Sequence, residues 1–191
     1  GKQGEARGKK VLVALCVISG GAYLLALLFV RHDFGFPLDD AWIHLTFARN
    51  IGTRGEFAFL PGQPSAGSTS PLWSILLSIA FMVRVDPIAW AYALGIACLI
   101  ATSLLAARLA HQLFPDERRL PIVVGVFVAL EWHLAWAAVS GMETMLFIAL
   151  SLALLVAHQT QRVEPRGAMS RFTLGLLGGL LTLTRPEGVV L

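Results

Sequence analysis

The sequence predicts an all-α membrane protein, a bundle of about five transmembrane helices. Hydrophobic residues make up 56% of its 191 residues and charged residues only 14%, which lies outside the usual balance of a soluble globular domain. Residues 11–30 form an apolar run without any charged residue, long enough as a helix to cross the roughly 30 Å hydrocarbon layer. Further apolar runs follow at residues 88–109, 120–139 and 142–158, and from Phe172 towards the end of the chain.

The first run, residues 11–30, is predicted to be a retained transmembrane helix that follows a cytoplasmic tail at residues 1–10. A cleaved signal peptide is the alternative, but the run is longer than a typical signal h-region and no small-residue cleavage site follows it. The tail carries several basic residues: Lys2, Arg7, Lys9 and Lys10. Because Lys and Arg concentrate in cytoplasmic connections, the tail is expected inside the cell.

A shorter apolar run, residues 71–83, spans only about 20 Å as a helix and is too short for a full crossing. Basic residues mark two later connections as cytoplasmic: Arg108, Arg118 and Arg119 in one, and Arg162, Arg166 and Arg171 in the other. A full crossing at residues 71–83 would move both connections outside. We therefore expect a single transmembrane domain over residues 1–191, with one external loop at 31–87 that contains juxtamembrane helices, and four further spans in 88–191.

This topology brings the unusual polar residues to the external face. They are Asp39, Asp40, Glu143, Arg185 and Glu187, with Glu131 inside its span near the outer end. Ionisable groups at membrane depth are costly and usually face a cavity or a partner, so Glu131 and Arg185 are functional candidates. A structural ion pair between these two residues is the alternative.

The segment "FGFPLDDAWIHLTFARN", residues 34–50, is predicted to form a short amphipathic helix on the membrane surface. Asp39 is placed to cap that helix. His44 lies one turn after Asp40, so their side chains are expected to meet. The alternative is an interfacial anchor whose acids merely face water.

Residues 55–73 are rich in Gly, Pro and Ser and predict a folded external loop. Ser68, Thr69 and Ser70 are candidates to cap the helix that follows at Pro71. Trp73 is expected at the level of the lipid headgroups.

Four motifs follow one another in this chain: "DDAWIHLTFARN", "PGQPSAGSTSPLW", "GMETMLF" and "TRPEG". Their order and predicted topology resemble bacterial GT-C glycosyltransferases, especially the arabinofuranosyltransferase-like and mannosyltransferase-like polytopic enzymes. The resemblance implies a GT-C-like bundle that transfers a sugar from a polyprenyl-phosphate donor at the external membrane face, usually with inversion. It also implies that an essential acid of the first external loop corresponds to Asp39, with Asp40 beside it. Since such enzymes have more spans, the chain is expected to be the N-terminal part of a longer protein.

The residue chemistry agrees with that reaction. A carboxylate in a partly dry cleft suits the general base that deprotonates an acceptor hydroxyl, and Asp39 is the first choice. Arg185, and after it Arg49, is the candidate for binding the lipid phosphate. His44, Glu131, Glu143 and Glu187 complete the candidate substrate-binding set. Two adjacent acids fall far short of a metal site, so no cofactor is expected, although a divalent cation is left open.

Other features exclude several function classes. No phosphate-binding loop or dinucleotide fingerprint occurs. Cys16 and Cys98 lie in apolar runs, which supports neither a disulfide framework nor a metal site. The net charge of +3 comes largely from the cytoplasmic connections and indicates contact with anionic lipid, not nucleic acid.

The expected partners are the polyprenyl-phosphate sugar donor, a glycan, lipid or protein acceptor, and the lipid bilayer. The expected location is the bacterial plasma membrane, with the N-terminus cytoplasmic and the active site external. A membrane transporter or lipid flippase, with Glu131 and Arg185 lining the path, is the competing hypothesis. A non-catalytic membrane subunit is a third.

Overall fold

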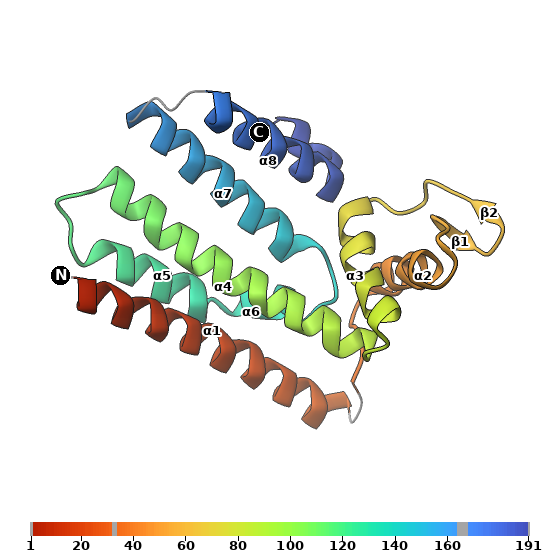
Figure 1. Ribbon diagram of the computed structural model, residues 1–191. Helices are drawn as coiled ribbons and strands as arrows, with labels where there is room; N and C mark the ends of the chain where they lie inside the picture. The colour runs from red at the N-terminus through yellow and green to blue at the C-terminus, as the bar shows by residue number, and fades with distance from the viewer. Residues whose placement is uncertain (1, 32–33, 164–167, 191) are drawn as a thin grey trace.

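The computed structural model describes residues 2–31, 34–163 and 168–190, which are mostly helical (Figure 1). Three of the helices are long and apolar enough to cross a membrane. They are α1 (Lys2–Arg31), α4 (Pro87–Leu113) and α7 (Thr144–Val163). This agrees with the predicted class, an all-α membrane protein.

The number of spans differs from the prediction. The apolar run at residues 120–139 is divided into α5 (Leu120–Leu130) and α6 (Trp132–Ala138), which are bent by 59° relative to each other. The last apolar run forms α8 (Ala168–Thr184), whose apolar part is a shorter helix. Length and composition therefore support three spans among the described residues, or four if the bent pair is one span, where about five were predicted.

The predicted external loop contains the two expected helices and one unexpected element. The helices are α2 (Asp39–Arg54) and α3 (Pro71–Val83). Between them, β1 (Ala58–Leu60) pairs antiparallel with β2 (Gln63–Pro64). All four elements lie at one end of the bundle, beyond the long helices (Figure 1).

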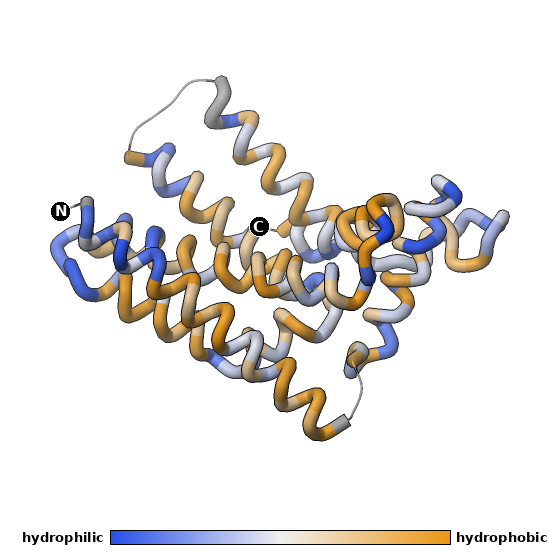
Figure 2. Tube along the Cα trace, turned by 60° about the horizontal axis from the view of Figure 1, so that its bottom comes forward, coloured by the Kyte–Doolittle hydropathy of each residue, from blue (hydrophilic) through white to orange (hydrophobic). Residues whose placement is uncertain are grey.

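The basic and polar segments lie at opposite ends of the bundle. The N-terminus, the α4–α5 connection and the end of α7 share one end, whereas α2, α3 and the start of α7 share the other (Figure 1). Hydrophilic residues concentrate near the N-terminus and the α4–α5 connection, and apolar residues dominate the helices between the ends (Figure 2). The grouping follows the predicted topology, and which end faces the cytoplasm stays a prediction.

Helix α4 lies at the centre of the bundle and packs against α1, α5, α6 and α7. Its contact with the end of α6 depends on a glycine, because a Cβ atom on Gly95 would lie 1.7 Å from the Ala138 carbonyl oxygen. Only a residue without a side chain allows two backbones to approach this closely. Gly95 therefore fixes where the bent segment meets the central helix.

We predict that Gly95→Ala lowers stability, because the added methyl group must push α4 and α6 apart, and overpacking of this kind costs about 1–3 kcal/mol. The measurement is the thermal unfolding midpoint of the purified protein in detergent.

Gly175→Ala is the matched control on α8, where a Cβ atom would meet nothing within 4 Å. It should leave the midpoint unchanged or raise it slightly, since alanine favours a helix. Equal midpoints for the two variants would show that the Gly95 contact is not needed for packing.

Candidate functional site

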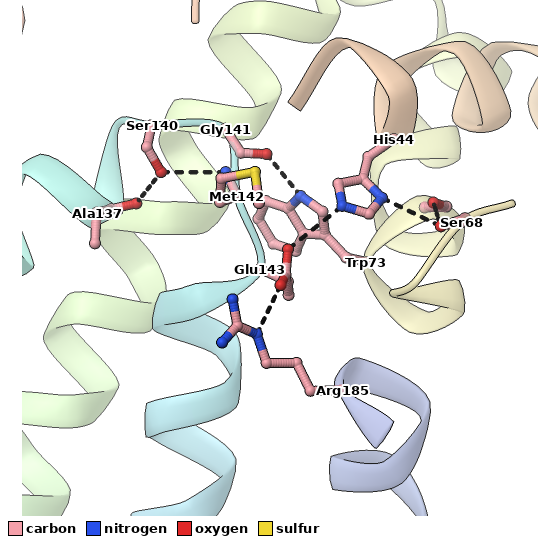
Figure 3. A network of polar contacts seen from close by, with 10 residues as sticks. His44, Ser68, Trp73, Ala137, Ser140, Gly141, Met142, Glu143 and Arg185 are labelled. Atoms are coloured by element: carbon pink, nitrogen blue, oxygen red, sulfur yellow. Dashed lines mark hydrogen bonds and ion pairs between the residues drawn. The ribbon is translucent and has the colours of Figure 1, made fainter. Parts of the chain in front are cut away.

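A buried polar cluster forms where α2, α7 and the end of α8 meet (Figure 3). Glu143 immediately precedes α7 and is 3% exposed. Its Oε1 accepts a 2.7 Å hydrogen bond from Arg185 Nε, and its Oε2 lies 3.4 Å from His44 Nε2. At 3.4 Å the contact with His44 is an electrostatic one and not a good hydrogen bond. One carboxylate thus joins residues from two distant segments.

The cluster continues through two serine side chains on the other side of His44. His44 Nδ1 lies 3.1 Å from Ser68 Oγ, and Ser68 Oγ lies 3.0 Å from Ser74 Oγ. The tautomer of His44 decides which atom donates in its contact with Ser68, and either serine hydroxyl can donate to the other. The histidine, both serines and Glu143 are buried. We refer to His44, Ser68, Ser74, Glu143 and Arg185 as the Glu143 cluster.

Backbone geometry presents Glu143 to the cluster. Trp73 Nε1 donates a 2.8 Å hydrogen bond to the carbonyl of Gly141. Gly141 has φ 79°, and a Cβ atom there would lie 2.5 Å from the Phe36 ring, so this turn requires glycine. Trp73 is 1% exposed, so its ring is covered by protein, and its depth relative to the lipid headgroups stays a prediction. Its ring packs inside the protein, because its N–H has a backbone acceptor there.

Glu143 is ionised at neutral pH. Burial alone raises the pKa of a carboxyl group, but His44, the backbone and Arg185 stabilise the carboxylate and bring the pKa of Glu143 down from 4.5 to about 2. The charge is therefore balanced inside the protein by Arg185, whose side chain is 38% exposed.

Asp39 and Asp40 lie outside the Glu143 cluster. Both are exposed in the first turn of α2, where the helix dipole favours acids. The N-cap residue is Leu38, so the prediction that Asp39 caps the helix was wrong. The expected contact between Asp40 and His44 is also absent, because His44 is buried against Ser68 and Glu143. Neither acid forms a hydrogen bond or ion pair with another residue that the structure describes, so both are free to meet a ligand.

Glu131 has a local role at the bend between α5 and α6. Its carboxylate accepts a 2.9 Å hydrogen bond from Leu134 N and so caps α6. The other carboxylate oxygen lies 2.6 Å from His133 Nδ1. Arg185 binds Glu143, so the ion pair between Glu131 and Arg185, which was the alternative to a functional role, is not formed. The charge of Glu131 ends one helix and starts the next, which is why the predicted single span is broken here.

The remaining candidates lie apart from the Glu143 cluster. Glu187 is exposed in the 3₁₀ turn η1 (Pro186–Val190), and no other described residue pairs with it. Arg49 is exposed on α2 and lines a separate cavity. Within the ranges that the structure describes, no group of three His, Cys, Asp or Glu side chains is arranged to hold a metal ion. Cation dependence stays an open prediction.

Sequence reasoning missed the two serines of the site, Ser68 and Ser74, which continue the cluster from His44. Ser68 was one of three candidates to cap α3, but its side chain contacts His44. Ser70 occupies the cap position and makes no side-chain cap bond. Ser74 lies inside α3 with no pattern that distinguishes it from other small residues on an apolar helix. The available signal was the repeated Ser and Thr before Pro71, which indicates a polar region but not its partner.

We predict that Glu143 and Arg185 are energetically coupled. Because Arg185 stays partly exposed, the coupling should fall below the 3–5 kcal/mol of a fully buried pair, at about 1–2 kcal/mol. A double-mutant cycle with Glu143→Gln, Arg185→Gln and the double variant, followed by thermal unfolding in detergent, measures it. Additive effects of the two substitutions would contradict the coupling.

We also predict a pH dependence that belongs to Glu143. Its folded pKa of about 2 lies below the usual 4.5, so the unfolded state binds the proton first as pH falls. The stability difference between the wild type and Glu143→Gln should be constant above about pH 5 and should shrink as pH falls from 4.5 towards 2. Unfolding measured from pH 7 to pH 3 tests this, and a difference that does not change with pH would refute it.

Comparison of the chain with protein-family models, with curated proteins and with solved structures gives no match. The functional assignment therefore depends on the residues and contacts described above.

Proposed function

We propose that the chain is the membrane part of a GT-C-like glycosyltransferase, in which Asp39 acts as the general base. The donor is a sugar linked to a polyprenyl phosphate, and the acceptor is a hydroxyl group of a glycan, lipid or protein. The reaction takes place at the end of the bundle that carries α2 and α3, which we assign to the external face of a bacterial plasma membrane.

The observation that carries the proposal is the convergence of four separate motifs at one end of the bundle. His44 comes from "DDAWIHLTFARN", Ser68 from "PGQPSAGSTSPLW" and Glu143 from "GMETMLF". Arg185 comes from "TRPEG" and binds Glu143 directly. These are the segments whose order resembles the GT-C enzymes. Their contacts support the proposal of one shared site, since the buried Glu143 carboxylate contacts residues of two other segments.

The carboxylates at this end divide into bound and available groups. Glu143 is buried between Arg185 and His44, so it cannot reach an acceptor. Asp39 and Asp40 are exposed a short distance along α2 from His44. An unpaired carboxylate at a helix N-terminus is able to take a proton from a hydroxyl group that binds beside it. We assign this role to Asp39 and a supporting role to Asp40.

The proposed step is a direct displacement at the sugar. Asp39 takes the proton from the acceptor hydroxyl, and the oxygen forms a bond to the anomeric carbon. The bond between that carbon and the phosphate oxygen breaks, and the lipid phosphate leaves with the electron pair. Attack opposite the leaving group inverts the anomeric configuration.

Arg185 is suited to bind the leaving phosphate. Glu143 accepts from Nε only, which leaves both terminal nitrogens of the guanidinium as donors. The side chain is 38% exposed and lies 6.0 Å from the Phe147 ring centroid. Glu143 orients the guanidinium through one edge, so the other edge can accept a phosphate in bidentate geometry.

A transporter or lipid flippase is the second candidate, and the bend at Glu131 favours it. Transporters often bind their substrates where a membrane helix is interrupted, and α5 and α6 meet at an angle of 59°. However, Glu131 pairs with His133 and not with Arg185. Uptake of labelled sugar or lipid into proteoliposomes without glycosyl transfer would favour this candidate.

We predict that Asp39→Asn in the full-length protein lowers turnover at least about a hundredfold, the lower end of general-base contributions. Because Asp39 is exposed and does not cap the helix, folding and membrane insertion should be kept. The assay is sugar transfer from a polyprenyl-phosphate donor, with helix content checked by circular dichroism.

Two further variants serve as controls. Asp40→Asn should cause a smaller loss than Asp39→Asn. Asp116→Asn, in the α4–α5 connection at the opposite end of the bundle, should have no effect. Normal turnover by Asp39→Asn with loss confined to Asp40→Asn would transfer the base role to Asp40.

A further inference from the structure

We propose that a cavity between α2, α3 and the start of α4 binds the phosphate headgroup of an anionic membrane phospholipid. The cavity has a volume of about 280 Å³. It is lined by Trp42, Leu45, Thr46, Arg49, Phe81 and Pro87. None of these residues belongs to the Glu143 cluster, and the inference does not depend on the proposed glycosyl transfer.

The lining of the cavity is amphipathic. Trp42, Leu45 and Phe81 supply apolar walls, and Arg49 supplies a positive charge. Arg49 is exposed, and no described acid forms an ion pair with it. The Thr46 hydroxyl already donates to the Trp42 carbonyl at 2.9 Å, so the guanidinium is the charged donor that the lining offers to an anion. One cation beside apolar walls fits a ligand with a charged head and an apolar body.

The cavity lies at the depth where lipid headgroups are expected. Pro87 lines it and is also the first residue of α4, one of the candidate spans. The residues on α2 follow one helical stripe, from Trp42 through Thr46 to Arg49. Trp42 is 44% exposed, and exposed tryptophans of membrane proteins concentrate at the bilayer surface. The stripe therefore faces the region where a lipid phosphate meets its acyl chains.

Charges of both signs lie near the cavity, since Asp39 lies one turn before Trp42 on α2, but the charged residue that lines the cavity is Arg49. Arg84 is exposed in the connection between α3 and α4. Asp86 lies in the same connection, and its carboxylate accepts a 2.7 Å hydrogen bond from Ala89 N at the start of α4. Charge complementarity thus favours an anionic headgroup over a zwitterionic one.

A phospholipid fits this cavity better than free phosphate does. An inorganic anion would contact Arg49 but would leave the apolar walls of Trp42 and Phe81 unfilled. A phosphodiester headgroup places its phosphate on Arg49 and its first carbon atoms against those rings. The same lipid would hold α2 and α3 against the membrane surface.

The test uses Trp42 as the reporter, in the purified chain reconstituted into nanodiscs. Brominated phosphatidylglycerol and brominated phosphatidylcholine quench nearby tryptophans, and the difference between the wild type and Trp42→Phe isolates Trp42 from the other four tryptophans. We expect brominated phosphatidylglycerol to quench half of the Trp42 fluorescence at a mole fraction about fivefold lower than brominated phosphatidylcholine needs. A preference of this size is what one arginine near the membrane surface provides. Arg49→Gln should abolish this preference, and Arg49→Lys should keep most of it.

Arg54→Gln is the matched control, because Arg54 is exposed in the last turn of the same helix and does not line the cavity. It should keep the preference for phosphatidylglycerol. Equal loss in Arg49→Gln and Arg54→Gln would reduce the effect to diffuse surface attraction and overturn the site. Equal quenching of Trp42 by both lipids would overturn it too. Release of brominated phosphatidylglycerol by trace unlabelled polyprenyl phosphate would assign the cavity to that lipid and would also reject our proposal.

Discussion

The buried carboxylate of Glu143 is the constraint on which the polar end of the bundle depends. A carboxylate that is 3% exposed is stable only when positive or hydrogen-donating groups surround it. Arg185 supplies the charge from the end of α8, and His44 supplies a ring nitrogen from α2. Removing either segment would leave an unbalanced buried charge. The position of α2 relative to the long helices is therefore set by electrostatics as well as by apolar packing.

Apolar packing supplies the remaining restraints at this end. Trp73 of α3 is buried with Phe36, Leu77 and Val139 in one hydrophobic cluster, and its N–H donates to the carbonyl of Gly141, two residues before Glu143. The same turn thus carries an aromatic contact on one side and the charged cluster on the other. The Trp73 ring therefore stays among apolar side chains, while the nearby Glu143 carboxylate stays among its polar partners.

The acids at this end differ in burial and in partners. Glu143 organises the site from inside, whereas Asp39 and Asp40 remain exposed in the first turn of α2. The two candidate phosphate-binding arginines differ in the same way. Arg185 is held by Glu143, whereas Arg49 is exposed on α2 and lines the separate cavity. A partly buried ion pair beside exposed acids fits the proposed reaction, in which a fixed support would position the reacting groups.

The sequence by itself determined the membrane class, the helix at residues 71–83, the helix that starts at Asp39 and the grouping of polar motifs at one end, because apolar run length and basic connections are local signals. Tertiary structure decided which polar groups meet. Glu143 rather than Glu131 binds Arg185, and His44 turns from Asp40 towards Ser68. The tertiary structure also divides the apolar run at residues 120–139 into α5 and α6, where the Glu131 carboxylate caps α6. Partner choice depends on residues as many as 42 positions apart, and no local pattern records which of several acids will be buried beside a distant arginine.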